Sequence, residues 1–142
     1  AILETMVALS SYLLIFASVV LFGYNLASFI ENFGMLEKKV GNYRKMLLEF
    51  DEPLASARRV NAIQNVLMLA GYAAVAHFAG FAFWVLALVL VKFSVSCFLS
   101  DWMHRVILNR EASLSRAFYI FHKVDSLLNG LLCAFMLLAL VL

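Results

Sequence analysis

Charged residues are scarce in this sequence: Asp, Glu, Lys and Arg together make up 14% of its 142 residues. Soluble domains carry about 25% charged and about 45–50% apolar residues. In this chain, by contrast, 65% of the residues are apolar and the mean hydropathy is +0.93. Too few polar side chains are present to cover a surface that faces water. The composition therefore excludes an ordinary soluble domain and predicts an integral membrane protein.

Proline, glycine and cysteine are also rare. One proline, six glycines and no low-complexity tract leave no room for a disordered linker or a second, soluble domain. We therefore expect a single membrane domain over residues 1–142. The two cysteines, Cys97 and Cys133, form neither a disulfide framework nor a Cys-x-x-Cys motif. Phosphate-binding loops, nucleophile elbows and zinc-protease motifs are missing too, so the sequence holds no complete catalytic motif.

Long apolar runs are what the sequence has in abundance. Residues 5–30 contain no charge, and the run from Val60 to Ser100 contains only Lys92. At about 1.5 Å rise per residue, that second run is about twice as long as a hydrocarbon core of about 30 Å, so it must fold back near residues 77–80. The runs are continuous rather than alternating, which favours helices over barrel strands. We predict an all-α integral membrane protein, a four-transmembrane-helix bundle with spans at about 5–30, 60–78, 81–103 and 117–142.

Ten of the eleven Lys and Arg residues lie in or beside two connections, the first and the third. The second connection and both ends contain none. By the positive-inside rule, we expect both basic loops to be cytoplasmic and both termini to lie on the outer side. The net charge of +2 then reflects topology and contact with anionic lipid, not nucleic acid. Both ends stop at the membrane edge, which leads us to expect a longer parent chain.

The first connection has the pattern of an amphipathic cytoplasmic helix. Between Gly34 and Pro53, apolar residues recur at spacings of three and four, and the helix is expected to end near Pro53. Two interpretations stay open: the helix lies on anionic headgroups or a partner subunit, or it packs on the chain's own loop. The basic residues of this candidate surface are Lys38, Lys39, Arg44 and Lys45.

Polar residues inside the spans share one face of each helix. A polar side chain in hydrocarbon is expensive unless it faces another helix or water, so we expect these faces to converge in the bundle. Either they line a polar pocket open to the cytoplasmic side, or they hold the bundle together through hydrogen bonds between helices. On the fourth span the polar face consists of His122, Asp125, Ser126, Asn129 and Cys133.

Two helical motifs, Asp101-x-x-His104 and His122-x-x-Asp125, place an imidazole and a carboxylate on one face of the third and of the fourth span. If the hairpin turns near residues 112–113, the two histidines share one depth and the two aspartates another. Imidazole and carboxylate groups suit zinc, iron, copper or manganese, and two opposed histidines suit a haem. The alternative is salt bridges with neighbouring arginines and lysines. The predicted transition-metal or haem site consists of Asp101, His104, His122, Asp125 and Glu31.

Lys92 is predicted to lie near the middle of the bilayer. Asp101 is about 13.5 Å away along the helix, and Asp125 is about 12 Å away along the antiparallel fourth span. Sequence spacing therefore places no acid of this chain at its depth. The alternatives are a neutral or hydrogen-bonded lysine, an ion pathway, or a carboxylate from another subunit. We favour the last and predict that Lys92 contacts a partner protein.

The spacing Arg58-x-x-Asn61-x-x-Gln64, at the start of the second span, resembles a motif of the membrane-associated eicosanoid and glutathione metabolism family. These are trimeric four-helix enzymes with Arg-x-x-Asn-x-x-Glu at this place. The resemblance covers this motif and the topology, and it implies a transferase that binds a thiol between subunits at the cytoplasmic side. The chain departs from the family at Gln64, where the family has Glu. It departs again at residues 96–101, where SCFLSD replaces the Arg and aromatic residues of a glutathione site.

Three functions follow as hypotheses from the sequence. The leading one is an integral membrane subunit of a larger assembly, acting through helix docking and lipid contact with other membrane protein subunits. It depends on Lys92, on the basic first loop and on the lack of a catalytic motif. The second is a metal- or haem-binding redox membrane protein, and the third is a glutathione-type transferase.

Overall fold

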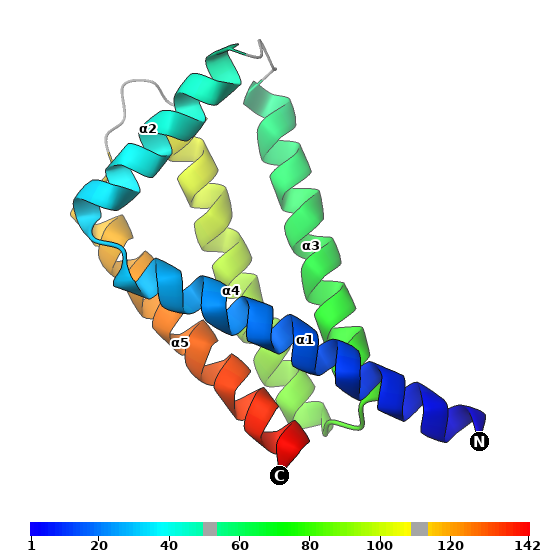
Figure 1. The fold of residues 1–142 in the computed structure, drawn as a ribbon. Helices are drawn as coiled ribbons and strands as arrows, with labels where there is room; N and C mark the ends of the chain where they lie inside the picture. The colour runs from blue at the N-terminus through cyan, green and yellow to red at the C-terminus, as the bar shows by residue number, and fades with distance from the viewer. Residues whose placement is uncertain (50–53, 109–113) are drawn as a thin grey trace.

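The computed structural model describes residues 1–49, 54–108 and 114–142, and the regular elements within these ranges are all helices, without strands. The prediction of an all-α fold is confirmed. The five helices, shown in Figure 1, are α1 (Ile2–Ile30), α2 (Phe33–Glu49), α3 (Leu54–Phe78), α4 (Phe83–Leu108) and α5 (Arg116–Val141). Two positions used in the sequence analysis, Pro53 and the turn at 112–113, lie outside the described residues.

Three helices are long and apolar enough to cross a membrane: α1, α5 and residues Phe83–Ile107 of α4. They identify the chain as a membrane protein by length and composition. The fourth predicted span corresponds to α3, which has 25 residues but does not reach the same apolar content. Asn61, Gln64 and Asn65 reduce the hydropathy of its first half. The described helices therefore contain three spans that meet this criterion, and the four-span bundle is not confirmed.

The turn between α3 and α4 occurs where the sequence predicts it. Gly80 has a φ of 95°, a left-handed conformation that glycine adopts without strain. The backbone N–H of Phe81 donates to the carbonyl oxygen of Ala76 over 3.2 Å. The backbone N–H of Gly80 donates to the carbonyl oxygen of His77 over 3.0 Å. These bonds satisfy carbonyls at the end of α3, as in other helices that end at a left-handed glycine. The chain then reverses and begins α4.

α3 and α4 pack against each other along their whole length. Near one end, Arg58 forms an ion pair with Asp101. Further along, the rings of Tyr72 and Phe93 meet edge to face at 5.4 Å, and His77 meets Phe83 beside the turn. The two helices therefore form an antiparallel hairpin.

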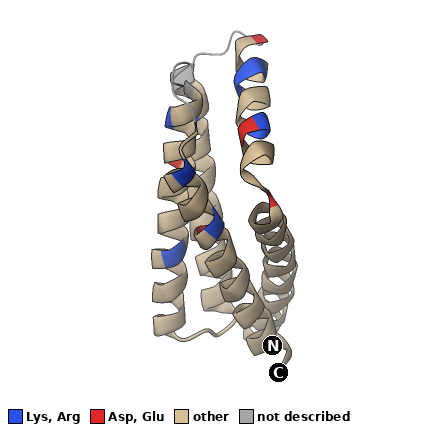
Figure 2. Ribbon diagram, turned by 90° about the vertical axis from the view of Figure 1, so that its left-hand side faces the viewer, with Lys and Arg blue, Asp and Glu red and all other residues tan. Residues whose placement is uncertain are grey.

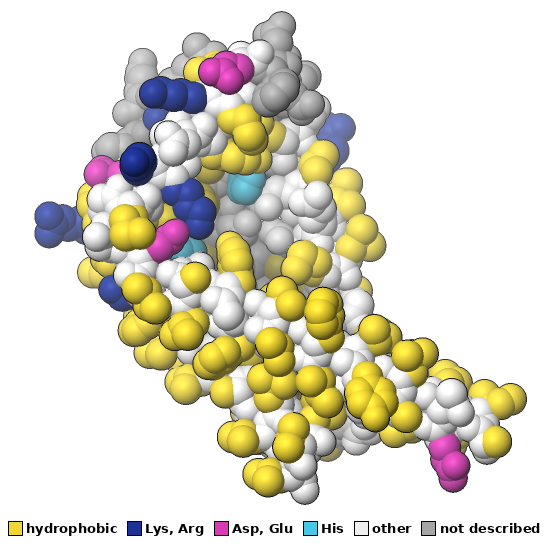
Figure 3. Space-filling view, viewed as in Figure 1, with side chains coloured by type: hydrophobic (Ala, Val, Ile, Leu, Met, Phe, Trp, Pro, Cys, Tyr) yellow, Lys and Arg dark blue, Asp and Glu magenta, His cyan; other side chains and the backbone are white. Residues whose placement is uncertain are grey.

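α1 runs at an angle across the bundle and packs antiparallel to α5 (Figure 1). The apolar core between the helices contains Leu14, Val89 and Met136, all completely buried. The hydroxyls of Ser18 and Tyr72 lie 2.7 Å apart and join α1 to α3. The first turns of α1 extend past the other helices, as Figure 3 also shows, and Ile2 is 80% exposed.

The amphipathic helix predicted in the first connection is α2. Its apolar side chains Leu36, Val40 and Leu47 are buried and pack against residues of α4 and α5. Arg44 donates to the carbonyl oxygens of Val106 at 2.9 Å and Ile107 at 3.0 Å, near the end of α4. A cation there satisfies carbonyls that the helix leaves open and complements the helix dipole. α2 therefore packs on its own chain and Arg44 faces inward, while Lys38, Lys39 and Lys45 stay exposed.

Figure 2 shows that the positions of Lys and Arg along the ribbon gather toward the end of the bundle that carries α2. The other end, where the termini and the α3–α4 turn lie, is formed by segments without Lys or Arg. This separation along the bundle axis matches the two basic connections in the sequence.

Candidate functional site

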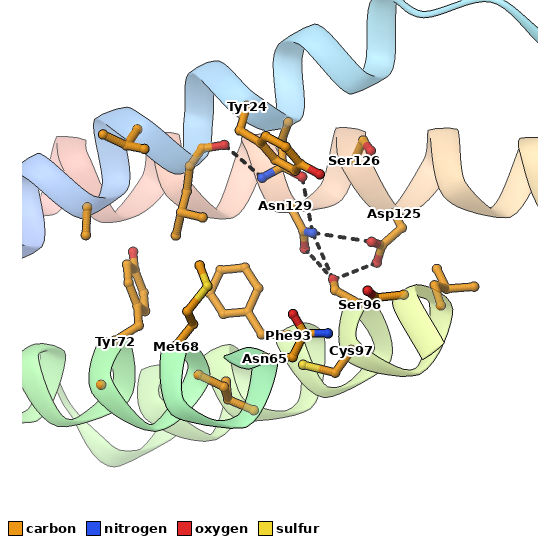
Figure 4. A pocket seen from close by; sticks show the side chains of 18 of the residues that line it. Tyr24, Asn65, Met68, Tyr72, Phe93, Ser96, Cys97, Asp125, Ser126 and Asn129 are labelled. Carbon is orange, nitrogen blue, oxygen red and sulfur yellow. Dashed lines mark hydrogen bonds between the residues drawn. The ribbon is translucent and has the colours of Figure 1, made fainter. Parts of the chain in front are cut away.

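A group of polar side chains lies between α4, α5 and α1 within the apolar part of the bundle. Lys92 of α4 forms an ion pair with Asp125 of α5. The ammonium nitrogen is also 2.8 Å from Oδ1 of Asn129 and 3.4 Å from Oγ of Ser96. The relative exposure of the side chains is 16% for Lys92 and 10% for Asp125. We call Lys92, Ser96, Asp125, Asn129 and Asn25 the polar cluster; Figure 4 shows part of it.

The sequence spacing explains how the polar cluster forms. Lys92 and Ser96 are four residues apart on α4, and Asp125 and Asn129 are four residues apart on α5, so each pair shares a helix face. Ser96 Oγ donates to Asp125 Oδ1 over 3.0 Å, and the amide nitrogen of Asn129 is 2.8 Å from Ser96 Oγ. The same amide nitrogen is 3.3 Å from Oδ1 of Asn25. The polar cluster therefore joins three helices.

The expectation that no acid of this chain reaches Lys92 is wrong. Asp125 lies level with Ser96 and not with Asp101, as the contacts between α4 and α5 show. This difference of five residues is about 7.5 Å along a helix axis. The flexible four-carbon stem of the lysine spans the remaining distance. Lys92 is therefore paired within the chain, and the argument that it needs a partner's carboxylate no longer holds.

The predicted metal or haem site is not assembled either. The parts of the chain that the structure describes contain no group of three or more His, Cys, Asp or Glu residues that could hold a metal ion. His104 contacts the carbonyl of Ser100 at 3.0 Å, and the ring of His122 stacks on that of Phe118. The prediction required Asp101 and Asp125 to lie at the same depth. Asp125 lies level with Ser96 instead, so this requirement is not met.

The remaining acids of that prediction are held by basic side chains. Asp101 accepts hydrogen bonds from Arg58 at 2.7 and 2.9 Å and forms an ion pair with Arg105 at 3.0 Å. Glu31 forms an ion pair with Lys39 at 3.2 Å. The alternative of salt bridges with neighbouring cations is therefore the one observed for these two acids.

A cavity of about 610 Å³ lies beside the polar cluster, between α1, α3, α4 and α5 (Figure 4). Figure 3 shows the corresponding hollow between α1, α2 and α3. One end of the cavity is apolar, with walls formed by Leu14, Phe16, Leu69, Val75 and Phe93. The other end is lined by hydrogen-bonding side chains, namely Asn25, Asn65, Ser96, Ser100, His122, Asp125, Ser126 and Asn129.

Asn65 is the unusual member of this wall. Its amide nitrogen is buried and has no hydrogen-bond partner among the described residues. A buried donor left without a partner costs about 1–3 kcal/mol, so such groups call for an explanation. Asn65 lines the cavity, and a rotation of its amide group would bring this nitrogen to an acceptor on a bound molecule.

The cavity opens sideways, between α1 and α3. Residues that line it are also largely exposed on the outer surface: Phe16 is 70% exposed, Tyr24 62% and Met68 61%. These residues lie on two different helices, so together they form the two sides of an opening. Figure 3 shows hydrophobic side chains along the α1 side of the hollow, and charged and His side chains on its α2 side.

The structure contains both hydrogen bonds between helices and a pocket, while the predicted opening of the pocket to the cytoplasmic side stays a prediction. Interhelical hydrogen bonds are formed by the polar cluster, and a pocket with a polar end lies next to it. Of the residues that matter here, Asn129 belonged to the predicted polar face of the fourth span, but Ser96 was missed. The pattern that could have identified Ser96 is its position four residues after Lys92, on the same face of α4.

Comparison of the chain with protein-family models, with curated proteins and with solved structures gives no match. The motif that resembles a glutathione-metabolism family has a local structural role in this chain. Arg58 binds Asp101, and the amide of Asn61 lies 3.1 Å from the hydroxyl of Ser100. Both contacts attach α3 to α4, and Gln64 is exposed.

Proposed function

We propose that this chain is a four-span membrane protein that binds an amphipathic molecule taken from the bilayer. The observation that carries the proposal is the cavity, which is apolar at one end, hydrogen-bonding at the other and open sideways between α1 and α3. Its volume of about 610 Å³ falls within the range of about 300–1,000 Å³ typical of small-molecule sites.

The proposal takes α3 as the fourth span. α3 packs along the whole of α4, which is itself long and apolar enough to cross, and the two are joined by a tight turn. A helix held in this way reaches as far through the membrane as its neighbour. By the positive-inside rule, the end of the bundle with α2 is then cytoplasmic and both termini are on the outer side.

In this arrangement the sideways opening faces lipid. A molecule with an apolar tail can enter between α1 and α3 without passing through water, and its tail replaces lipid against Phe16 and Met68. Its polar group then reaches Asn65 and the polar cluster, in the half of the membrane nearer to α2. The two ends of the cavity therefore select for amphipathic molecules.

Gly71→Phe is expected to block the site. Gly71 lines the cavity, and a Cβ added there would meet no heavy atom within 4 Å, so a larger side chain begins in open space. The test uses photoreactive amphiphiles of one chain length with hydroxyl, carboxylate or trimethylammonium heads, in phosphatidylcholine nanodiscs. We expect at least one to label the cavity wall of the wild type, and labelling to fall about tenfold in the variant, which corresponds to about 1.4 kcal/mol.

Gly23→Phe is the matched control. Gly23 is a helical glycine on α1 with equally open space, but it does not line the cavity. Its variant is expected to be labelled like the wild type. If none of the probes labels the wall, or if both variants lose labelling equally, the proposal is wrong.

A second candidate function is membership of a larger membrane assembly. The exposure of α1 favours it: 11% of the α1 span is buried inside the chain, against 39% for α5. Tyr12 of α1 is 73% exposed, with Tyr24 and Phe16 on the same helix. A helix of another membrane protein could cover this face, while the exposed lysines of α2 contact anionic lipid.

Disulfide cross-linking tests this candidate. We expect Tyr12→Cys to form a specific adduct with one partner in native membranes, and gentle extraction to give a mass well above the 15.9 kDa of the chain. Val141→Cys, which is as exposed but lies at the end of α5, serves as the control and is expected to stay unlinked. A monomer in native-like lipid, with no adduct at position 12, contradicts the assembly.

A further inference from the structure

We infer that the molecule bound in the cavity carries an uncharged head with a hydrogen-bond acceptor, such as a hydroxyl or a carbonyl oxygen. This inference rests on the proposed function and specifies the chemical class of its ligand. It follows from which groups at the polar end of the cavity are already paired and which are open.

The charged groups in the wall are already paired. Two of the described lining residues, Lys39 and Asp125, carry a Lys, Arg, Asp or Glu side chain. Lys39 is 3.2 Å from Glu31, and Asp125 is paired with Lys92 and hydrogen-bonded by Ser96 and Asn129. A charged head would therefore lose its hydration without gaining an unpaired opposite charge, which is strongly unfavourable.

The open groups in the same wall are uncharged. The amide nitrogen of Asn65 is buried and unpartnered, and the side chains of Ser126 and Cys97 make no hydrogen bond to any other described residue. Figure 4 shows Asn65 and Cys97 on the α3–α4 side of the cavity and Ser126 on the opposite side. Asn65 needs an acceptor, and the Ser126 hydroxyl can donate or accept.

A head with one hydroxyl or carbonyl oxygen matches this set. After a rotation of the Asn65 amide group, the head accepts a hydrogen bond from its nitrogen. This satisfies a donor that is otherwise buried without a partner and leaves both ion pairs intact. Its tail lies along the apolar walls toward the opening between α1 and α3. Long-chain alcohols and monoacylglycerols are members of this class, and a long-chain alcohol is the simplest probe for it.

The three photoreactive probes named above, with equal chains and different heads, test the inference. We expect the hydroxyl probe to label the cavity wall about tenfold more strongly than the carboxylate or trimethylammonium probe. Asn65→Leu is expected to reduce labelling by the hydroxyl probe about tenfold without lowering the thermal stability, because it removes an unpartnered donor. Gln64→Leu, at an exposed neighbour that does not line the cavity, is the control and should label like the wild type.

The outcomes separate this inference from the proposed function. If all three probes label equally and Gly71→Phe blocks them all, the cavity binds amphiphiles but the inference about the head is wrong. Preference for the carboxylate probe also overturns it, and would point to a positive charge supplied by His122 or Lys39. Unchanged hydroxyl labelling in Asn65→Leu overturns the role of the Asn65 amide. If no probe labels the wall, the proposed function itself fails.

Discussion

Asp125→Leu is expected to lower the free energy of unfolding by about 3–5 kcal/mol, because it leaves the Lys92 ammonium buried without a counter-charge. The lysine side chain is 16% exposed, and its other contacts are the neutral groups of Ser96 and Asn129. These cannot replace a carboxylate. The effect is measurable as a fall in the midpoint of thermal unfolding in detergent or in nanodiscs.

The double variant Lys92→Met with Asp125→Leu is expected to recover most of this loss, because replacing a buried ion pair by apolar groups is often close to neutral. Asp101→Leu provides the matched control. Asp101 pairs with Arg58 and Arg105, whose side chains are 42% and 55% exposed, so this change should cost no more than about 1 kcal/mol. Equal losses for the two aspartates, or a double variant as unstable as the single one, contradict the role assigned to this ion pair.

Phe118→Ala is expected to destabilise the protein by about 3–5 kcal/mol, the range found for buried aromatic residues truncated to alanine. Phe118 is 1% exposed and packs with Leu36 of α2 and Leu99 of α4. Its ring also meets that of Trp102 edge to face at 5.1 Å. The cavity left by the ring therefore loosens α2 as well as the α4–α5 contact, and we expect faster proteolysis of α2 along with the lower unfolding temperature.

Phe121→Ala is the control for this prediction. Phe121 also contacts Trp102 and lies on the same helix, but it is 57% exposed, so lipid or detergent replaces the lost contacts. Its effect should stay below about 1 kcal/mol, as for most surface substitutions. Equal effects of the two phenylalanine changes would show that the buried position of Phe118 does not contribute as described.

The helices could be predicted because their signals are local. Long apolar runs predicted α1, α4 and α5, and the spacing of Leu36, Val40 and Leu47 predicted the amphipathic helix α2. The polar faces were also informative, since Ser126 and Asn129 are buried as expected of residues that face other helices. α3 is the exception, because its polar face lowers the hydropathy by which membrane spans are recognised.

The geometry between helices could not be predicted in the same way. The register between α4 and α5 depends on the connection 109–115 and on side-chain packing. Residue spacing within one helix predicts neither. An error of five residues was enough to separate Lys92 from Asp125 and to bring Asp101 and Asp125 wrongly to one site. The cavity has a similar origin: it depends on the angle at which α1 crosses the bundle, which the sequence of α1 alone does not set.

The pairing of the first helix with the last has a consequence for the order of assembly. α3 and α4 are neighbours in the chain, so their hairpin forms from local contacts at low entropic cost. α1, by contrast, packs on α5, and the contact between Asn25 and Asn129 joins residues 104 positions apart. During synthesis, α1 enters the membrane with Asn25 still lacking its neighbour on α5, and Asn25 stays so until the last helix is made. Closure of α1 onto α5 is therefore the final step, and the cavity between α1 and α3 is completed only when the whole chain has been inserted.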